Sequence, residues 1–333
     1  MRSLVQPQPH PDFSGIFDSD VLHRLASRRR GLAASARALE ENHGEAKGSR
    51  PRSFEPPALV AIRDRHLVVE VSAGGGTYAD RQRAWVRYFR AGREAGLLGE
   101  KGLLAELRGV DEEAFRGALG ECIAAHALMA GLGHEVTART SGKDGSLPDL
   151  RVTDRATGLA VTAEVKSPAD DFVGNAWWGS SASTIRRAVS KAGSQLPEET
   201  PCVAVLVPYL RTLVYLQVAQ LVEALIGTWQ WKVPIDVDAG VPVGPVEPDF
   251  RQNGKLAAIR RDSGTGFERT DLTRVSAVLV VEELVVASGA EAGEIGLAMT
   301  VAHNPFAARP IPPAFFGGAR QLVGTPEGVR WIR

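Results

Sequence analysis

The chain has 333 residues, a formal net charge of +0 at pH 7, 44% hydrophobic residues and 23% charged residues. This length allows one large or two ordinary domains, and the composition predicts a soluble globular protein. The zero net charge gives no support for a nucleic-acid partner, although a local cluster of charge could still attract one. No apolar run approaches the roughly 18 residues of a transmembrane helix, and the first residues lack the apolar core of a signal peptide. The sequence therefore favours a cytoplasmic protein with no membrane partner.

The two cysteines, Cys122 and Cys202, both lie in apolar runs. This placement favours buried thiols in a reducing compartment over a disulfide framework. Because the sequence contains no C-x-x-C pair, a zinc site built on paired cysteines is excluded.

The first third of the chain is rich in arginine. Residues 1–56 are interpreted as a mobile, partly helical segment with a linker, including a helix at 18–42. Residues 57–110 are expected to form a hairpin at 58–76 and a basic helix at 77–98 that pack on the core. The arginines of that helix either contact phosphates or form an ordinary solvated face.

A clearer pattern of helices and strands begins at residue 111. The expected elements are a helix at 111–132, strands at 134–140, 148–153 and 159–166, a helix at 183–195, a strand at 201–208, a helix at 210–227, a strand at 275–281 and a closing hairpin around 324–328. This order predicts an α/β fold with a mixed sheet. The core is assigned to residues 111–230, and residues 231–333 are expected to form a C-terminal α/β extension with further strands.

The stretch PDLRVTDRATGLAVTAEVKS, residues 148–167, predicts a hairpin with three charged residues on one face. Its turn is DRATG, residues 154–158, so Asp149 is expected directly opposite Glu164, with Cβ atoms about 4.5–5.5 Å apart. Because side chains alternate between the two faces of a strand, Lys166 lies on the same face as Asp149 and Glu164, while the apolar residues of both strands lie on the other face. Because adjacent carboxylates repel each other, the pattern indicates a cation between them.

These residue types suit metal-assisted hydrolysis of a phosphodiester. Mg²⁺ prefers oxygen ligands and keeps several waters, so Asp149, Glu164 and the backbone carbonyl of Val165 are the candidate ligands. The metal would acidify a bound water and neutralise charge on the phosphate. Lys166 would position or help to deprotonate the attacking water, or stabilise the phosphate oxygens.

Two short motifs of this hairpin resemble those of a known family, and they are Pro148-Asp149 and Glu164-Val165-Lys166. They are similar to the PD and (D/E)xK motifs of the PD-(D/E)xK, or restriction-endonuclease-like, nuclease superfamily. The resemblance covers residues 111–208 and implies an α-β-β-β-α-β core. It implies Mg²⁺ as the cofactor, for which Mn²⁺ can substitute.

The resemblance also implies two further site residues. The first core helix of such proteins often carries an acidic residue that faces the metal, and Glu121 is the candidate here, the alternative being an ordinary carboxylate at the border of the apolar stripe. The helix after the third strand often contributes a polar residue, and the sequence offers Arg186, Arg187, Lys191 and Gln195 there. Lys191 and Gln195 either contact a scissile phosphate or are ordinary surface residues of the helix. Both lie on one helical face, because they are four residues apart.

The resulting hypothesis is a metal-dependent endonuclease, with DNA favoured over RNA and a homodimer as an option that the resemblance allows. One alternative is a catalytically inactive protein of the same fold that binds nucleic acid or acts as an assembly scaffold. Another is a protein-interaction module in which the acids and the lysine form an exposed charge network. Trp177 and Trp178, in the loop after Lys166, either stack on bases or anchor that loop.

Overall fold

The computed structural model describes most of the chain from residue 78 onwards. The described residues are 78–99, 102–109, 111–139, 148–168, 181–208, 218–239, 241–251, 254–256, 271–285, 295–325 and 328–332. The helix expected at 18–42, the hairpin expected at 58–76, and Trp177 with Trp178 lie outside these ranges. The chain divides into two compact units, which are residues 1–123 with 283–296, and residues 124–282 with 297–333.

The described helices of the first unit are α4 (Tyr78–Glu94), α5 (Leu103–Leu107) and the larger part of α6 (Glu112–His126). The basic helix expected at 77–98 is confirmed by α4. Its Trp85 and Phe89 are both 2% exposed, and their ring centroids lie 5.9 Å apart. Gly92 lets α4 approach α6 closely, because a Cβ at this position would lie 2.6 Å from the sulfur of Cys122.

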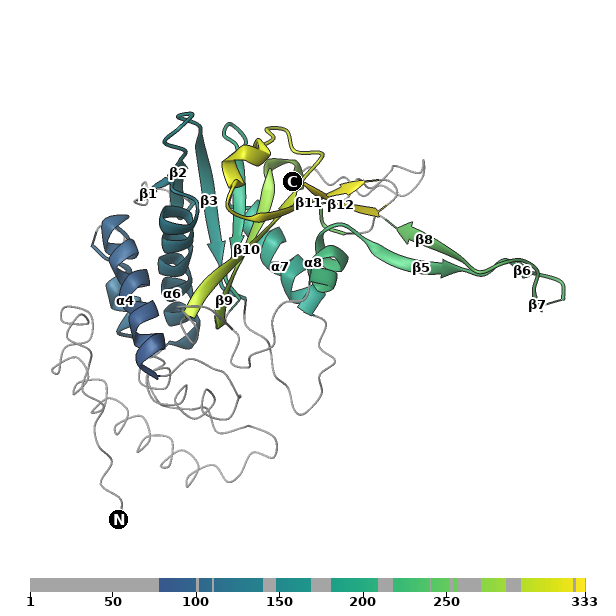
Figure 1. The fold of residues 1–333 in the computed structure, drawn as a ribbon, viewed down its shortest axis with the longest axis horizontal. Helices are drawn as coiled ribbons and strands as arrows, with labels where there is room; N and C mark the ends of the chain where they lie inside the picture. The colour runs from purple at the N-terminus through teal and green to yellow at the C-terminus, as the bar shows by residue number, and fades with distance from the viewer. Residues whose placement is uncertain are drawn as a thin grey trace, which may run out of the picture. The chain divides into compact units, whose positions relative to one another are not determined.

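The described strands include an eight-stranded sheet in the order β1-β2-β3-β4-β9-β10-β11-β12 (Figure 1). The strands are β1 (Glu135–Ala138), β2 (Leu150–Thr153), β3 (Ala160–Lys166), β4 (Cys202–Leu206), β9 (Ala277–Val285), β10 (Ile295–His303), β11 (Arg320–Thr325) and β12 (Gly328–Ile332). β2 is antiparallel to β1 and β3, whereas β4 is parallel to β3 and β9. β11 is parallel to β10 and antiparallel to β12. The expected α/β fold with a mixed sheet is confirmed, and β9 to β12 continue the same sheet.

One face of this sheet is covered by two helices, α7 (Ser181–Gly193) and α8 (Val218–Leu225). Even-numbered residues of β4, Ala204 and Leu206, point to this face and pack with Ile185 of α7 and Leu225 of α8. Each large buried aliphatic side chain stabilises the fold by about 1.5–3 kcal/mol. The helices therefore fix the layer above β3 and β4.

The remaining described elements are η2 (Ala127–Gly131), η3 (Asp271–Arg274), η4 (Pro313–Phe316), β5 (Thr228–Lys232), β6 (Ile235–Asp236), β7 (Val241–Pro242) and β8 (Glu247–Arg251). β5 pairs with β8 and β6 with β7, in two small antiparallel sheets whose positions were not predicted. Among the described helices, none is long and apolar enough to cross a membrane.

A buried polar network joins β10, β11 and η4. The side-chain amide of Gln321 donates hydrogen bonds to the carbonyl oxygens of Pro313, across 3.1 Å, and Phe316, across 2.9 Å. Its side-chain oxygen therefore faces His303, whose Nε2–H donates to it across 2.8 Å. Burial lowers the pKa of His303, and the hydrogen bond to Gln321 opposes this effect only in part.

We expect His303 to make the stability of the fold depend on pH. Because its folded-state pKa lies below the unfolded value of about 6.5, the unfolded state binds more protons in this window. The contribution of neutral His303 to the free energy of unfolding is therefore fully present above about pH 6.5, and it decreases as the pH falls toward the folded-state pKa. Urea unfolding between about pH 7.5 and 5.5 measures the decline. The His303→Gln variant keeps a hydrogen-bond donor for Gln321 but has no side chain that titrates in this range, so its free energy of unfolding should decrease less steeply as the pH falls. The same pH dependence in the variant and the wild type would show that His303 is not the cause.

Candidate functional site

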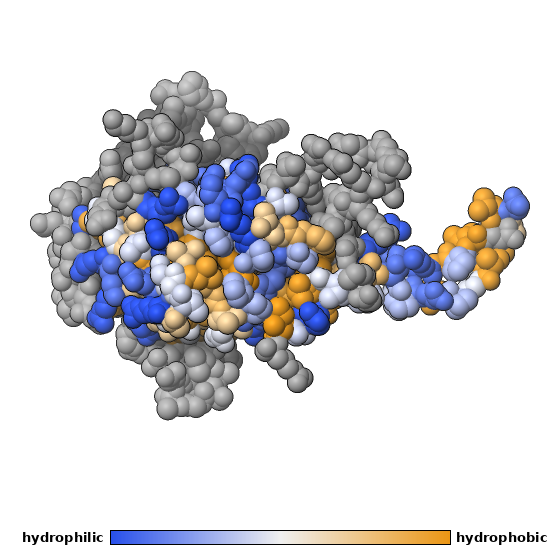
Figure 2. Space-filling view, turned by 90° about the horizontal axis from the view of Figure 1, so that it is seen from above, coloured by the Kyte–Doolittle hydropathy of each residue, from blue (hydrophilic) through white to orange (hydrophobic). Residues whose placement is uncertain are grey.

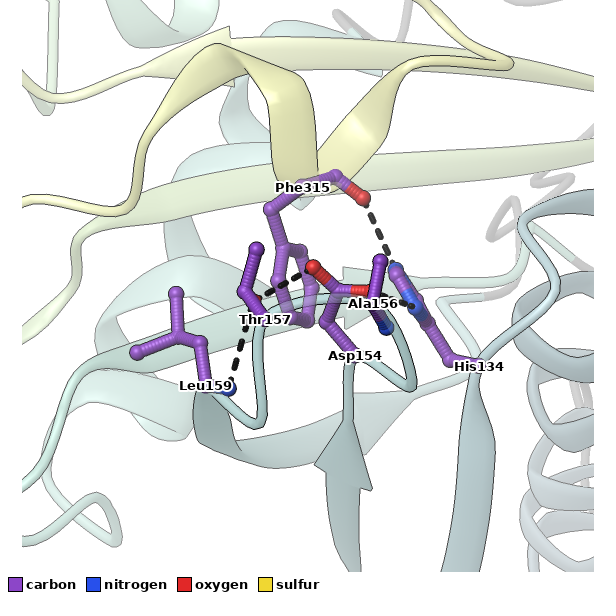
Figure 3. Close-up of polar contacts among 6 residues, drawn as sticks. All are labelled: His134, Asp154, Ala156, Thr157, Leu159 and Phe315. Atoms are coloured by element: carbon purple, nitrogen blue, oxygen red, sulfur yellow. Dashed lines mark hydrogen bonds and ion pairs between the residues drawn. The ribbon is translucent and has the colours of Figure 1, made fainter.

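The turn of the β2–β3 hairpin is built from its own side chains (Figure 3). The Asp154 carboxylate accepts hydrogen bonds from the Thr157 hydroxyl, across 2.6 Å, and from the Ala156 N–H, across 2.9 Å. These two bonds lower the pKa of Asp154. Gly158 has a φ of +74°, a left-handed conformation that glycine adopts at little cost. Together these residues fix the point where the chain reverses, and hence the register of the strands.

His134 connects this turn to η4, as Figure 3 shows. Its ring stacks on Phe315 with 4.2 Å between centroids, and its Nε2–H donates to the Phe315 carbonyl oxygen across 2.8 Å. Its Nδ1 lies 4.0 Å from the Asp154 carboxylate. His134 is 4% exposed, so it supports the turn from inside the fold. Sequence reasoning identified no partner for it, because Phe315 is 181 residues away.

The turn produces the register that was predicted. Leu150 pairs with Ala163, so the next position toward the open end of the hairpin places Asp149 opposite Glu164. The N–H of Val165 donates to the Asp149 carboxylate across 2.8 Å. This bond fixes the Asp149 side chain at the end of the strand ladder.

Successive residues of β3 direct their backbone N–H and carbonyl groups toward opposite neighbouring strands. This alternation determines where the Val165 carbonyl points. The N–H of Thr162 and the carbonyl of Lys166 both bond to residues that flank β4, each across 2.9 Å. Even-numbered residues of β3 thus direct their backbone groups toward β4, and odd-numbered residues toward β2. The Val165 carbonyl therefore points to the side where Asp149 lies.

Glu164 carries a buried carboxylate. It is 2% exposed, and its Oε1 contacts the Nζ of Lys166, which is 17% exposed. In-register pairing of Glu164 with Ala204 places both charged side chains on the face of the sheet that α7 covers. A buried carboxylate is costly unless it is paired, so Lys166 supplies the compensating charge.

The position of Gln195 follows from the direction of α7. It follows the last turn of α7, where its N–H donates to the carbonyl of Ala192 across 3.0 Å. Because a crossover helix runs opposite to the parallel strands it joins, Gln195 lies toward the beginning of β4, whereas Lys166 ends β3. Its side-chain oxygen is shielded from solvent and has no hydrogen-bond partner within the described part of the chain. Lys191 is exposed on α7.

Glu121, the other residue that the resemblance implied, is half-buried on α6. It belongs to the first unit, whereas Asp149 and Glu164 belong to the second, so the structure describes it apart from the hairpin. Its metal role stays a prediction. Its charge has a local effect, because it adds to burial in raising the pKa of the Cys122 thiol.

The oxygen atoms at the open end of the hairpin determine which kind of metal ion could bind there. Among the residues that the structure describes, no group of three or more His, Cys, Asp or Glu side chains could hold a metal ion. The hairpin instead combines two carboxylates with a backbone carbonyl, a set that suits Mg²⁺ because this ion keeps several of its waters. Cys122 and Cys202 are both free and buried, and burial raises the pKa of both thiols, so neither is a ready nucleophile.

Comparisons with known proteins leave the site to be judged on its geometry. No protein-family model matches the chain, and no curated protein or solved structure matches it significantly. The hairpin and its neighbours therefore carry the functional argument.

The buried pair can be tested through stability. Lys166→Met should lower the free energy of unfolding by about 3–5 kcal/mol, because it removes the cation that contacts the buried Glu164 carboxylate. Lys232→Met is the matched control, since Lys232 is 63% exposed and contacts Asp249 across 2.9 Å. Removing that exposed pair should cost at most about 1 kcal/mol. Urea unfolding at neutral pH measures both variants.

The double variant Glu164→Gln with Lys166→Met removes both charges and should recover part of the loss. Equal losses in the Lys166 and Lys232 variants would show that the Lys166–Glu164 contact does not behave as a buried ion pair.

Proposed function

We propose that this protein is a metal-dependent nuclease that hydrolyses phosphodiester bonds, with DNA as the favoured substrate. The supporting observation is the open end of the β2–β3 hairpin, where Asp149 and Glu164 occupy opposite positions and Lys166 contacts Glu164. Two acids held side by side against their mutual repulsion are suited to share a divalent cation. Mg²⁺ is the proposed ion, and Mn²⁺ can replace it.

The order of the elements supports the same proposal. α6, β1, β2, β3, α7 and β4 follow one another along the chain, which is the α-β-β-β-α-β order expected for a restriction-endonuclease-like core. In this arrangement the acidic hairpin pairs with the interior strand β4. The order of the elements does not by itself determine an activity, so the proposal rests on Asp149, Glu164 and Lys166 of the hairpin.

Each residue has a role that follows from its local contacts. Val165 holds Asp149 in place through its N–H and directs its own carbonyl to the same side. A divalent cation bound by these oxygens supplies Lewis-acid activation of water and neutralises charge on the scissile phosphate. Lys166 then donates hydrogen bonds from its ammonium group to the attacking water or to a phosphate oxygen.

One contact favours the non-catalytic alternative. Lys166 neutralises Glu164 directly, so the pair is stable without a metal ion. In that case Asp149 caps the end of the strand ladder, and the fold binds nucleic acid without cutting it. The exposed charge network is less well supported, because Glu164 is 2% exposed.

Cleavage assays test the proposal. Purified protein should cut supercoiled plasmid with Mg²⁺ or Mn²⁺ and not with EDTA, and single-stranded DNA and RNA serve as parallel substrates. Asp149→Asn, Glu164→Gln and Lys166→Met should each lower the rate by about 100-fold or more. The first two variants keep a hydrogen-bond acceptor for Val165 N–H and for Lys166, so they should fold. Glu198→Gln is the control, since Glu198 is 64% exposed in a pair with Arg274, and should cleave normally.

Binding measurements separate the alternatives. Titration calorimetry with Mn²⁺ should detect a site in the wild type that Asp149→Asn weakens. Metal and DNA binding without cleavage would support the inactive scaffold. Cleavage that survives both Asp149→Asn and Lys166→Met would overturn the site assignment.

A further inference from the structure

An arm of two small sheets extends from the second unit after α8. It comprises residues 228–239 and 241–251, in which β5 and β8 form the base half and β6 and β7 the tip half. Figure 1 shows this arm leading away from α8 and β12. A two-stranded ribbon is marginal by itself in water, so its occurrence as an isolated projection calls for an explanation.

The base half of the arm has one apolar and one polar face. Trp229 pairs with Phe250, and Trp231 with Pro248, so these four residues share a face. The opposite face carries the ion pairs that Asp249 makes with Lys232, across 2.9 Å, and with Arg251, across 3.7 Å. Val233, Ile235 and Val237 occupy the next odd-numbered positions toward the tip, with Val233 between β5 and β6 and Val237 in the turn after β6.

The base of the arm is packed closely against the rest of the unit. The Trp229 ring lies 5.0 Å from that of Phe250, and a Cβ at Gly328 of β12 would lie 3.1 Å from Trp229. At Gly227 a Cβ would lie 2.1 Å from the carbonyl oxygen of Arg251, so only glycine allows this approach. These contacts hold the base of the arm against the rest of the unit.

Much of the apolar face is open to solvent. The exposed fractions are Trp229 61%, Trp231 71%, Val233 40%, Ile235 57%, Val237 92% and Val246 53%. Val241 and Val243 of the tip are also exposed, by 50% and 60%, and Val241, opposite Asp236, lies on the other side of the ribbon from Ile235. Figure 2 shows hydrophobic residues gathered at the far end of the arm. Such side chains each expose on the order of 100 Å², and together they approach the ~800 Å² that one partner contributes to a standard interface. An apolar patch of this size marks an interaction site.

The charge of the arm disfavours a polyanion as its partner. Residues 228–251 contain four acids and two bases, and residues 233–246 contain two aspartates and no lysine or arginine. A nucleic-acid or anionic-lipid surface would be repelled by the tip. The partner is therefore another protein surface, with a complementary apolar face.

We infer that this partner is a second copy of the chain, with the two arms packed face to face and antiparallel about a two-fold axis. The base half presents the large rings of Trp229 and Trp231, whereas the tip half presents the smaller side chains of Val233, Ile235 and Val237. An antiparallel copy lays the tryptophans of one base half on the smaller side chains of the other tip half, which favours close packing. The same face serves both copies, as a two-fold interface requires. This inference is independent of the proposed nuclease activity.

Sedimentation equilibrium tests the dimer. The wild type should dimerise, and Trp231→Lys and Val237→Asp should each raise the dissociation constant by at least about 30-fold. Phe306→Lys is the matched control, because Phe306 is 48% exposed between β10 and η4, outside the arm, and it should leave the dimer intact. Circular dichroism checks that each variant is folded. A wild type that remains monomeric at about 100 μM, or a dimer that survives both arm variants, overturns the inference.

Cysteine cross-linking tests the antiparallel arrangement. Full overlap of antiparallel arms brings Val233, near the middle of the arm, close to its own copy, and keeps Val237 at the tip apart from its copy. Val233→Cys should therefore form a symmetric disulfide under mild oxidation, because bridged Cα atoms lie within about 7 Å, and Val237→Cys should not. Both native cysteines are buried and give a low background. Cross-linking of Val237→Cys alone would exclude antiparallel packing.

Loss of binding to a labelled DNA duplex in Trp231→Lys, with the protein monomeric throughout, would identify a nucleic-acid wedge instead.

Discussion

The hydrogen bond from the Val165 N–H to the Asp149 carboxylate joins two strands at the point where their ladder ends, and the candidate site depends on it. It exists because the turn at Asp154 sets a register in which Asp149 reaches the level of Glu164. A slip by one residue would move every side chain of one strand to the other face and would separate the two acids. The turn chemistry, far from the charged end, therefore determines the electrostatics of the site.

Burial then determines how the charges behave. Glu164 lies on an interior strand, on the face of the sheet that α7 covers, where it is 2% exposed, and its neighbour on that face, Lys166, contacts it. The chain has seven lysines among 39 basic residues, so lysine is the minority cation here. Lysine carries a compact charge on a flexible stem, which suits contact with a carboxylate two residues away in a strand.

In both the arm and the β2–β3 hairpin, apolar residues occupy alternate positions, but their side chains are exposed in the arm and buried in the hairpin. In β3 the apolar residues Val161 and Val165 are buried, because neighbouring strands and packed layers cover them. In the arm, Trp231 and Val237 alternate with polar residues in the same way, and yet they face solvent. The difference is the covering layer, since helices pack on the large sheet, whereas these side chains of the arm stay exposed. A second copy of the arm would provide that layer.

Much of the site could be predicted from the sequence by itself. Alternation and the turn DRATG determined that Asp149 lies opposite Glu164 and that Lys166 shares their face, because these relations depend on local chain geometry. The helices and strands of residues 111–208 were also predictable from their apolar periodicity. The alternation in TWQWKVPIDVD was a readable signal for the arm, but its proline and aspartates resembled a loop.

Only the tertiary structure decided the relations between distant segments. It brought His134 to Phe315 and His303 to Gln321, placed Glu164 beneath α7, and joined the C-terminal strands to the same sheet. It also located Gln195 near the beginning of β4, since the direction of a crossover helix depends on the strands that it joins. Periodicity specifies which face of an element is apolar. Which other element covers that face is determined by packing between residues far apart in the chain, and this packing leaves no local pattern.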